Sequence, residues 1–365
     1  MLVALSLVLC GVPAAAQSNQ PQDPAGSQTS PAPQGSSGPR ERKWEVEAHG
    51  GWSDASFQSS GSGTLPTTGL VVGGQINVSS FYFGDGARLF NQNLATASKS
   101  QPLHTVAPLD TILMSSVIDR RRRGGTLGVR LGRTLGRRLM IEMTADYSLS
   151  DLSFTSAALA GIEAARVSFA PAIGQALSVS SVPFTAASVA TVNDRQRAEQ
   201  LFVTGVLSLQ LKKTGIVIPY VTAGGGAVFN RGTLPGATLV GSYQLGAPPQ
   251  ILGTDTVELT YTMNNPTLVA IGGGGFRYFI TPRWGLRLDA RAYLHKNTTI
   301  NLVNATPTRV LASTGSGSFP LVNAGALQFS ATAPMNGPPF SGFTTFTGSG
   351  LQTHVNIAAG IFWRF

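Results

Sequence analysis

Apolar and polar residues alternate one by one along about eight segments of the chain. In each segment one set of alternate positions is mostly apolar and the other carries the polar and charged residues, a period of two that is typical of β-strands with one apolar face. These segments are Trp44–Trp52, Thr126–Thr134, Leu139–Leu152, Gln200–Leu211, Ile216–Phe229, Leu268–Ile280, Trp284–His295 and Leu351–Phe365.

The connections between these segments alternate between short turns and long loops. Short turns lie at Gly136–Arg138, Lys212–Gly215 and Thr281–Arg283, and the other connections are long segments rich in Gly, Ser, Thr and Pro. In bacterial outer-membrane barrels the short turns face the periplasm, the long loops face outward and the strand number is even. The sequence therefore predicts an all-β fold, a transmembrane antiparallel up-and-down β-barrel of about eight strands with long extracellular loops.

Three parts of the long loops suggest local structure. Ala157–Arg166 has the composition of a short helix, and Gly69–Phe83 is apolar enough to hide a further pair of strands. Phe81–Gly86 is an aromatic turn that either folds over the barrel or contacts a partner. Arg231–Asn265 is interpreted as a loop between two of the predicted strands.

Composition agrees with a membrane barrel. Only 12% of the residues are charged, whereas about 25% is usual for a soluble domain. No stretch beyond the first seventeen residues has the run of about 20 apolar residues that a spanning helix needs. We expect a protein of the bacterial outer membrane, with outer-membrane lipids as partners. The net charge of +9 comes without an aromatic-interleaved basic motif, so no nucleic-acid partner is expected.

The amino-terminal region divides into two parts. Residues 1–16 resemble a signal peptide, with an apolar stretch and small residues at Ala14 and Ala16 before Gln17. A lipoprotein anchor at Cys10 is the alternative, although Leu9 stands where a small residue is expected. Residues 17–42 are rich in Gln, Ser, Pro and Gly and are interpreted as a disordered periplasmic linker. The barrel is assigned to residues 43–365.

Charged residues within the strands fall on the face opposite the apolar one. A charge that faces lipid at the centre of the bilayer costs roughly 2–4 kcal/mol, so these side chains are expected to point into the barrel. Acidic and basic members balance, which predicts an ion-paired plug rather than an open channel. The alternative is a soluble, lipocalin-like barrel with the charges outside. The predicted interior set is Glu45, Glu47, Arg130, Glu142, Asp146, Arg277, Arg287, Asp289, Arg291 and Arg364.

The last strand resembles the carboxy-terminal assembly signal of bacterial outer-membrane proteins. Gly360, Trp363 and Phe365 match that signal, whereas Ala358 stands where a polar residue is usual. The resemblance implies recognition by the barrel-assembly machinery. In overall plan the chain is similar to the small OmpA-like transmembrane barrel families.

Other clusters have both functional and structural interpretations. The run Arg120, Arg121, Arg122 and Arg123 either binds lipopolysaccharide phosphates or is a solvated charge run at the rim. His295 and His354 share the inward phase; they either share a metal or act in acid–base chemistry, or they are polar plug residues. The runs Gly224–Gly226 and Gly272–Gly275 are interpreted as points of strand curvature or of close approach by another surface.

These observations favour a structural or surface-interaction role for the barrel. A narrow porin-like pore for small solutes is the alternative, and a lipid-modifying outer-membrane enzyme is a third possibility without a matching constellation of residues. No catalytic, cofactor-binding or metal site is expected, and the sequence does not define the oligomeric state.

Overall fold

The structure is a computed structural model that describes residues 43–56, 60–67, 71–72, 75–97, 102–120, 124–177, 183–245, 251–311, 327–329 and 342–365. The chain divides into two compact units, Met1–Glu41 and Arg42–Phe365. The predicted signal peptide and linker lie outside the described residues, as do Arg121, Arg122 and Arg123 of the arginine run. No helix in the described part of the second unit is long and apolar enough to cross a membrane.

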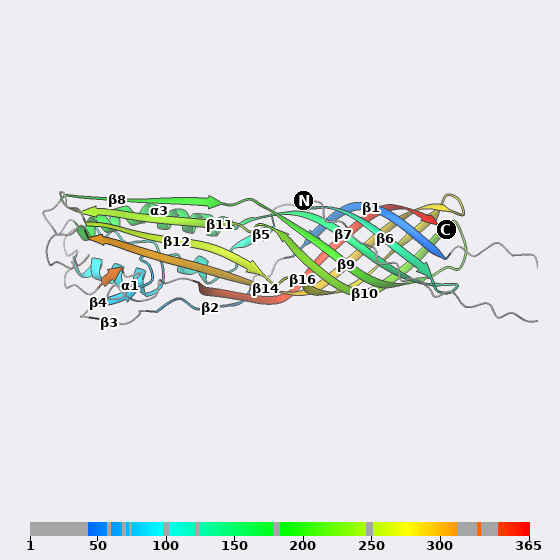
Figure 1. Ribbon diagram of the computed structural model, residues 1–365, viewed down its shortest axis with the longest axis horizontal. Helices are drawn as coiled ribbons and strands as arrows, with labels where there is room; N and C mark the ends of the chain where they lie inside the picture. The colour runs from blue at the N-terminus through cyan, green and yellow to red at the C-terminus, as the bar shows by residue number, and fades with distance from the viewer. Residues whose placement is uncertain are drawn as a thin grey trace, which may run out of the picture. The chain divides into compact units, whose positions relative to one another are not determined.

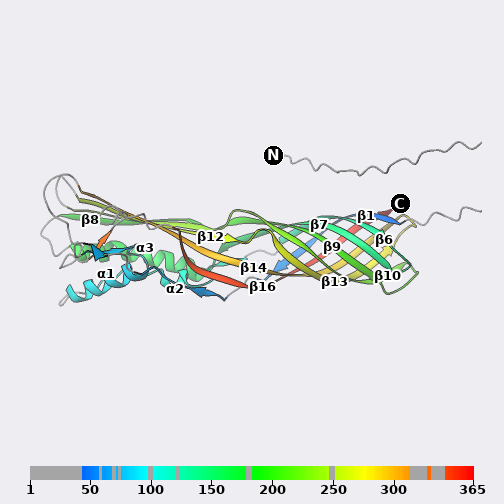
Figure 2. The same ribbon diagram turned by 60° about the horizontal axis from the view of Figure 1, so that its bottom comes forward.

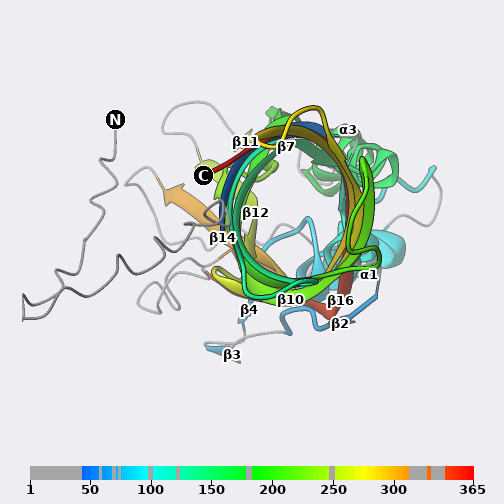
Figure 3. The ribbon, with the colours of Figure 1, turned by 90° about the vertical axis from the view of Figure 1, so that its right-hand side faces the viewer.

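Eight strands of the second unit pair antiparallel in a closed ring (Figures 1 and 3). Each strand is bonded to the next in the order given, and the last is bonded to the first. The ring strands are β1 (Trp44–Ala55), β6 (Gly124–Thr134), β7 (Leu139–Phe154), β9 (Gln196–Gln210), β10 (Val217–Gly232), β13 (Thr267–Phe279), β14 (Trp284–Leu311) and β16 (Phe343–Arg364).

The alternation in the sequence becomes the inside and the outside of this ring. Along β7, for example, Met140, Glu142 and Thr144 are buried while Leu139, Ile141 and Met143 are exposed. Successive side chains of a strand point to opposite faces, so the polar set fills the ring and the apolar set covers it. Large apolar side chains exposed on the outside include Trp44, Leu127, Val129, Leu131, Leu207, Phe276, Trp284, Leu288, Ile357, Ile361 and Trp363.

Beyond the ring the sheet continues into a second region, which we call the extension. From Lys296 onward β14 pairs with β16 on one side and, from Thr299, with β12 on the other. The sheet then continues through β11 to β8. The added strands are β8 (Phe184–Asn193), β11 (Gly236–Leu245) and β12 (Ile251–Met263).

The sheet is therefore larger than the sequence predicted. It contains 13 strands in the described part of the chain, so the estimate of about eight is wrong for the sheet as a whole. Arg231–Asn265, expected to be a loop, contains the end of β10 and the whole of β11 and β12. Many residues of these strands are small, and Gly and Pro border the strands. Within β12, Val257, Leu259 and Tyr261 nevertheless alternate with threonines and Glu258.

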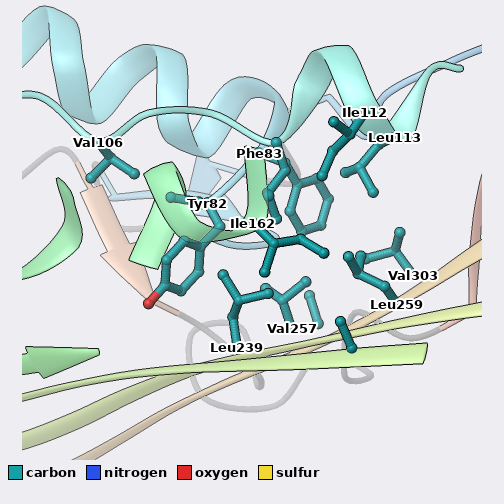
Figure 4. Packing of buried hydrophobic residues seen from close by; sticks show 14 of the residues in the cluster. Tyr82, Phe83, Val106, Ile112, Leu113, Ile162, Leu239, Val257, Leu259 and Val303 are labelled. Atoms are coloured by element: carbon teal, nitrogen blue, oxygen red, sulfur yellow. The ribbon is translucent and has the colours of Figure 1, made fainter. Parts of the chain in front are cut away.

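Three helices cover one face of the extension (Figure 2). They are α1 (Gly84–Ala97), α2 (Asp110–Leu113) and α3 (Ser156–Leu177). The short helix expected at Ala157–Arg166 is thus the first half of α3, which continues past Pro171. Buried side chains of helices and strands form one apolar cluster, which we call the extension core (Figure 4). It includes Phe83, Ile162, Phe169, Leu239, Val257 and Val303.

The aromatic turn belongs to this core. Phe81, Tyr82 and Phe83 are fully buried, and the ring of Tyr82 stacks on that of Phe169 at 4.8 Å between centroids. The pair of strands suspected within Gly69–Phe83 exists as β3 (Val71–Val72) and β4 (Gln75–Val78), which join β15 (Leu327–Phe329) in a separate small sheet. Two further short strands, β2 (Ser62–Gly63) and β5 (Ile118–Arg120), add to the main sheet.

Candidate functional site

The interior of the ring is the site that the sequence singled out. Nine of the ten predicted interior charges are buried there, and Arg364 lies at the end of the ring with 26% of its side chain exposed. The nine buried residues come from β1, β6, β7, β13 and β14. They converge because each strand directs its alternate residues inward. The buried acids are Glu45, Glu47, Glu142, Asp146 and Asp289, and the buried bases are Arg130, Arg277, Arg287 and Arg291.

Arg130 is the centre of one half of this network. One of its terminal nitrogens donates to both carboxylate oxygens of Glu47, at 2.8 and 2.9 Å. The other donates to Asp289 Oδ2 at 2.6 Å. Two carboxylates from different strands are thus joined by one planar guanidinium, whose fork of donors suits such pairing.

Glu142 is the centre of the other half. It accepts hydrogen bonds from Arg287 Nη2 at 2.9 and 3.1 Å, from Arg291 Nη2 at 3.1 Å and from Ser208 Oγ at 2.8 Å. Arg287 also lies over the ring of Tyr220, 4.2 Å from its centroid, and donates to the Tyr220 hydroxyl. That hydroxyl donates to Asp289, so the two halves form one continuous network.

A lower layer closes the end of the ring that carries the short turns. Arg277 is ion-paired with Glu45, and Arg364 is 3.8 Å from the same carboxylate. The guanidinium of Arg277 also lies 4.9 Å from the ring centroid of Phe362. A charged pair and an aromatic ring therefore occupy the interior at this level.

His49, Asp146 and Tyr293 form a layer above the main network. His49 Nε2 lies 2.5 Å from Asp146 Oδ1, and the hydroxyl of Tyr293 donates to Asp146 Oδ2 at 2.8 Å. Gly128 pairs in register with both His49 and Asp146, and a Cβ at this glycine would collide with both side chains. The sequence analysis missed His49 and Tyr220, although His49 follows Glu47 in the same inward phase.

His295 and His354 are both buried inside the ring. The ring of His354 lies 4.8 Å from Phe202 and 5.6 Å from Tyr293, between centroids. Among the described residues no group of three or more His, Cys, Asp or Glu side chains is placed to hold a metal ion. The geometry around His354 is that of an aromatic packing residue.

Two apolar clusters lie beside and beyond these polar layers. The first, inside the ring, consists of Phe202, Val206, Val228, Val269, Ile271 and Tyr293. The second is the extension core, which meets the end of the ring through Leu152, Phe154 and Tyr261. Charged, aromatic and apolar side chains thus fill the interior together.

The glycine runs make room for the interior network. Gly273 and Gly275 lie on the inward phase of β13, where Cβ atoms would collide with the backbone oxygens of Ala290 and Leu288 on β14 and would also meet Arg291 Cγ at 3.1 Å and the Tyr220 hydroxyl at 2.7 Å. Small residues at these positions leave space for large side chains on neighbouring strands. The close contact with the backbone of β14 agrees with the second interpretation considered from the sequence, with a neighbouring strand as the approaching surface.

The remaining predicted residues are those of the assembly signal and of the arginine run. Trp363 and Phe365 are exposed at the short-turn end, with ring centroids 4.9 Å apart, and Gly360 faces inward beside Glu47 and His49. Arg120 is the last residue of β5, and the rest of the arginine run lies outside the described residues.

Comparisons with known proteins add distant similarities only. No known protein family and no curated protein matches the sequence. Among solved structures the chain is similar to a major outer membrane protein from Thermus thermophilus, with 11% identity, a TM-score of 0.28 and coverage of 88% of this chain and 98% of that one. It is also similar to Acinetobacter baumannii CarO, with 13% identity, a TM-score of 0.22 and coverage of 68% and 94%.

A third similarity is to the translocator domain of the autotransporter NalP from Neisseria meningitidis, with 10% identity, a TM-score of 0.24 and coverage of 88% of both chains. All three are outer-membrane proteins by name or kind.

Proposed function

We propose that the chain is a bacterial outer-membrane protein whose ring is an eight-stranded transmembrane β-barrel. One observation supports this most strongly: charged side chains are buried and paired inside the ring while large apolar side chains are exposed on its outside. In water this arrangement is unfavourable because the apolar surface stays exposed, but in a bilayer it is the stable one. The short turns at one end and the plan of the ring also support the finer resemblance to small OmpA-like barrels.

Interfacial aromatics are consistent with this placement. Trp44, Trp284, Trp363 and Phe365 gather at the short-turn end, whereas Trp52 and Tyr147 lie toward the other end of their strands. Eight residues separate Trp44 from Trp52, which corresponds to about 26 Å along a strand. For a strand tilted by about 40°, this length projected on the barrel axis agrees to within several ångströms with an apolar band roughly 25 Å tall.

Within this barrel we propose a closed interior and therefore a structural or surface-interaction role for the protein, without enzymatic activity or a cofactor. The ion-paired network and the apolar layers above it support closure, because a conducting pore needs a continuous wet path. The folded extension is then the part that meets the surroundings, since it is built on the end of the ring opposite the short turns.

Conductance in a planar bilayer tests this proposal directly. The full chain is refolded in detergent, its folded state is verified by a shift in gel mobility on heating, and single channels are recorded. We expect folded protein without steady conductance. A stable, large conductance would contradict the closed interior and favour the porin-like alternative.

Two partners are proposed for the same protein. The arginine run Arg120–Arg123 is proposed to bind lipopolysaccharide phosphates; unchanged lipopolysaccharide association after replacement of all four arginines by Gln would refute this.

The final strand is proposed to be recognised by the barrel-assembly machinery. Deletion of Phe365 should then lower the amount of folded protein in the outer membrane without changing its synthesis.

A further inference from the structure

A cavity of about 250 Å³ opens in the side wall where the ring passes into the extension. Its lining includes Leu152 from β7, Ala198 and Gln200 from β9, Asn230 from β10, Leu234 after it, and Met263 from β12. None of the residues predicted from the sequence as functional takes part in it.

The cavity exists because the pairing of strands changes at this level. The last pair between β10 and β13 is Val228 with Thr267. Beyond it, residues 229–232 of β10 pair with β9 on one side and, among the described residues, with no strand on the other. The strand that could have covered this edge, β12, pairs with β14 instead. The cavity therefore opens between the end of β10 and the end of β12, where Asn264 and Asn265 hydrogen-bond to Asn230 in place of a paired strand.

The walls of the cavity are apolar and its floor is built of carboxamides. Leu234 and Met263 pack against the extension core, and Leu152 and Ala198 belong to it. On the floor, Gln200 Nε2 donates to Asn230 Oδ1 at 2.8 Å, and Asn265 Nδ2 donates to the Asn230 carbonyl at 2.9 Å. A carboxamide oxygen can accept two hydrogen bonds, so Asn230 Oδ1 can accept a second one from a ligand hydroxyl.

The charges at the cavity balance one another. Glu199 and Arg231 are the charged residues of the lining, and they face each other in register on β9 and β10. A ligand with a net charge would have to oppose one member of this pair. An uncharged ligand is therefore favoured.

The cavity lies at the edge of the apolar outer surface. Leu268, next to Thr267, is 82% exposed and faces outward just below the opening. If the ring spans a membrane, as proposed above, molecules dissolved at the lipid–water interface reach the opening directly.

From this geometry we infer that the cavity is a binding site for small uncharged amphiphiles, with an apolar ring or short chain and one hydroxyl. The apolar part lies against Leu234 and Met263, and the hydroxyl donates to Asn230. A cavity of about 150 Å³ holds benzene, so the present one has room for about two fused rings.

Binding of 1-naphthol to the refolded full chain in detergent micelles tests the inference, with its own fluorescence as the signal. Leu234→Trp fills the cavity, and Leu135→Trp, in an exposed short turn, is the matched control. We expect saturable binding to the unmodified chain and to Leu135→Trp, and at least tenfold weaker binding to Leu234→Trp. Equal affinity of the two variants, or absence of saturable binding to the unmodified chain, would overturn the site.

Two further measurements keep the result interpretable. If Leu234→Trp loses its heat-dependent gel shift, Ala198→Met fills the cavity from the other side, and Ala223→Met, on the outer face of β10, is its control.

Naphthalene, which lacks the hydroxyl, should bind several-fold more weakly than naphthol, and Asn230→Leu should abolish that difference. Equal binding of both probes to the unmodified chain would refute the role of Asn230. Because the assay uses micelles, failure here leaves the conductance test of the barrel unaffected.

Discussion

At the scale of single residues, Gly128 shows how closely the ring interior is filled. A Cβ at this position would collide with His49 and Asp146, whereas one at Gly125, on the outer face of the same strand, would meet nothing within 4 Å. Gly128→Ala should therefore destabilise the folded protein by about 1–3 kcal/mol, and Gly125→Ala should leave stability unchanged. Urea titration of the heat-dependent gel shift measures both; equal midpoints would contradict this account of the interior.

Arg130 allows a test of the ion-paired network itself. Arg130→Met leaves Glu47 and Asp289 buried without their shared partner, and removal of one member of a buried ion pair costs about 3–5 kcal/mol. We expect a correspondingly lower urea midpoint in micelles. The double variant Arg130→Met with Glu47→Gln should recover part of that loss, because Glu47 then keeps only contacts with His49 at 3.4 Å and Arg287 at 3.5 Å, whereas Asp289 still has Arg291 at 2.7 Å. A single variant as stable as the unmodified chain would show that the network is not energetically coupled.

The phase of a strand determines which residues face inward, but not which of them meet. Glu142 and Asp289 could be assigned to the interior from alternation alone, because a one-residue shift reverses every side chain. Their partners could not, because contact depends on strand order, tilt and stagger around the ring. Arg130 and Asp289 are 159 residues apart in the sequence and still 2.6 Å apart in the structure. Tyr220 was not in the predicted interior set because that set contains only charged residues.

At the scale of elements, Asp255 links the aromatic turn to β12. Its Oδ2 accepts hydrogen bonds from the Phe81 N–H at 2.8 Å and from Ser80 Oγ at 2.9 Å, within the extension core. Burial raises the pKa of this carboxyl from 3.8 to about 7. The folded state therefore holds the proton over a pH range in which the unfolded state has lost it.

The extension should accordingly lose stability as pH rises from about 4 to about 7, and change little above that. The full effect is on the order of 4 kcal/mol. Asp255→Asn should abolish this pH dependence, while Glu258→Gln, which alters an exposed carboxylate on the same strand, should retain it. Limited proteolysis of the extension across this pH range measures the difference. Greater resistance at pH 7 than at pH 5 in the unmodified chain would reverse the predicted sign.

The extension shows where sequence patterns stop being sufficient for whole elements. The alternation of Val257, Leu259 and Tyr261 is present in the sequence, but it lies within a segment predicted to be a loop. The second half of α3 was missed because Pro171 usually ends a helix. In the structure the buried face formed by Phe169, Ala172 and Ile173 packs on the extension core, and this packing outweighs the hydrogen bond lost at the proline.

At the scale of the whole molecule, the ring and the extension differ in the surfaces they expose. Large exposed apolar residues concentrate on the ring, whereas the extension exposes few beyond Val167, Phe184, Val189 and Val192. The extension also has its own apolar core with polar residues around it, as a region surrounded by water requires. If the ring spans a membrane, as proposed, the boundary between its lipid-facing part and the water-facing part falls where β14 leaves β13, near His295.

This division predicts the orientation of the protein in the cell. The only cysteine, Cys10, lies in the segment expected to be removed, so single cysteines can be placed at will. Thr191→Cys lies on an exposed position of β8 in the extension, and Arg137→Cys lies in the short turn between β6 and β7. Because short turns of outer-membrane barrels face the periplasm, a membrane-impermeant maleimide should label Thr191→Cys on intact cells and Arg137→Cys only after permeabilisation. The reverse pattern would invert the proposed orientation, and equal labelling of both on intact cells would exclude a membrane between them.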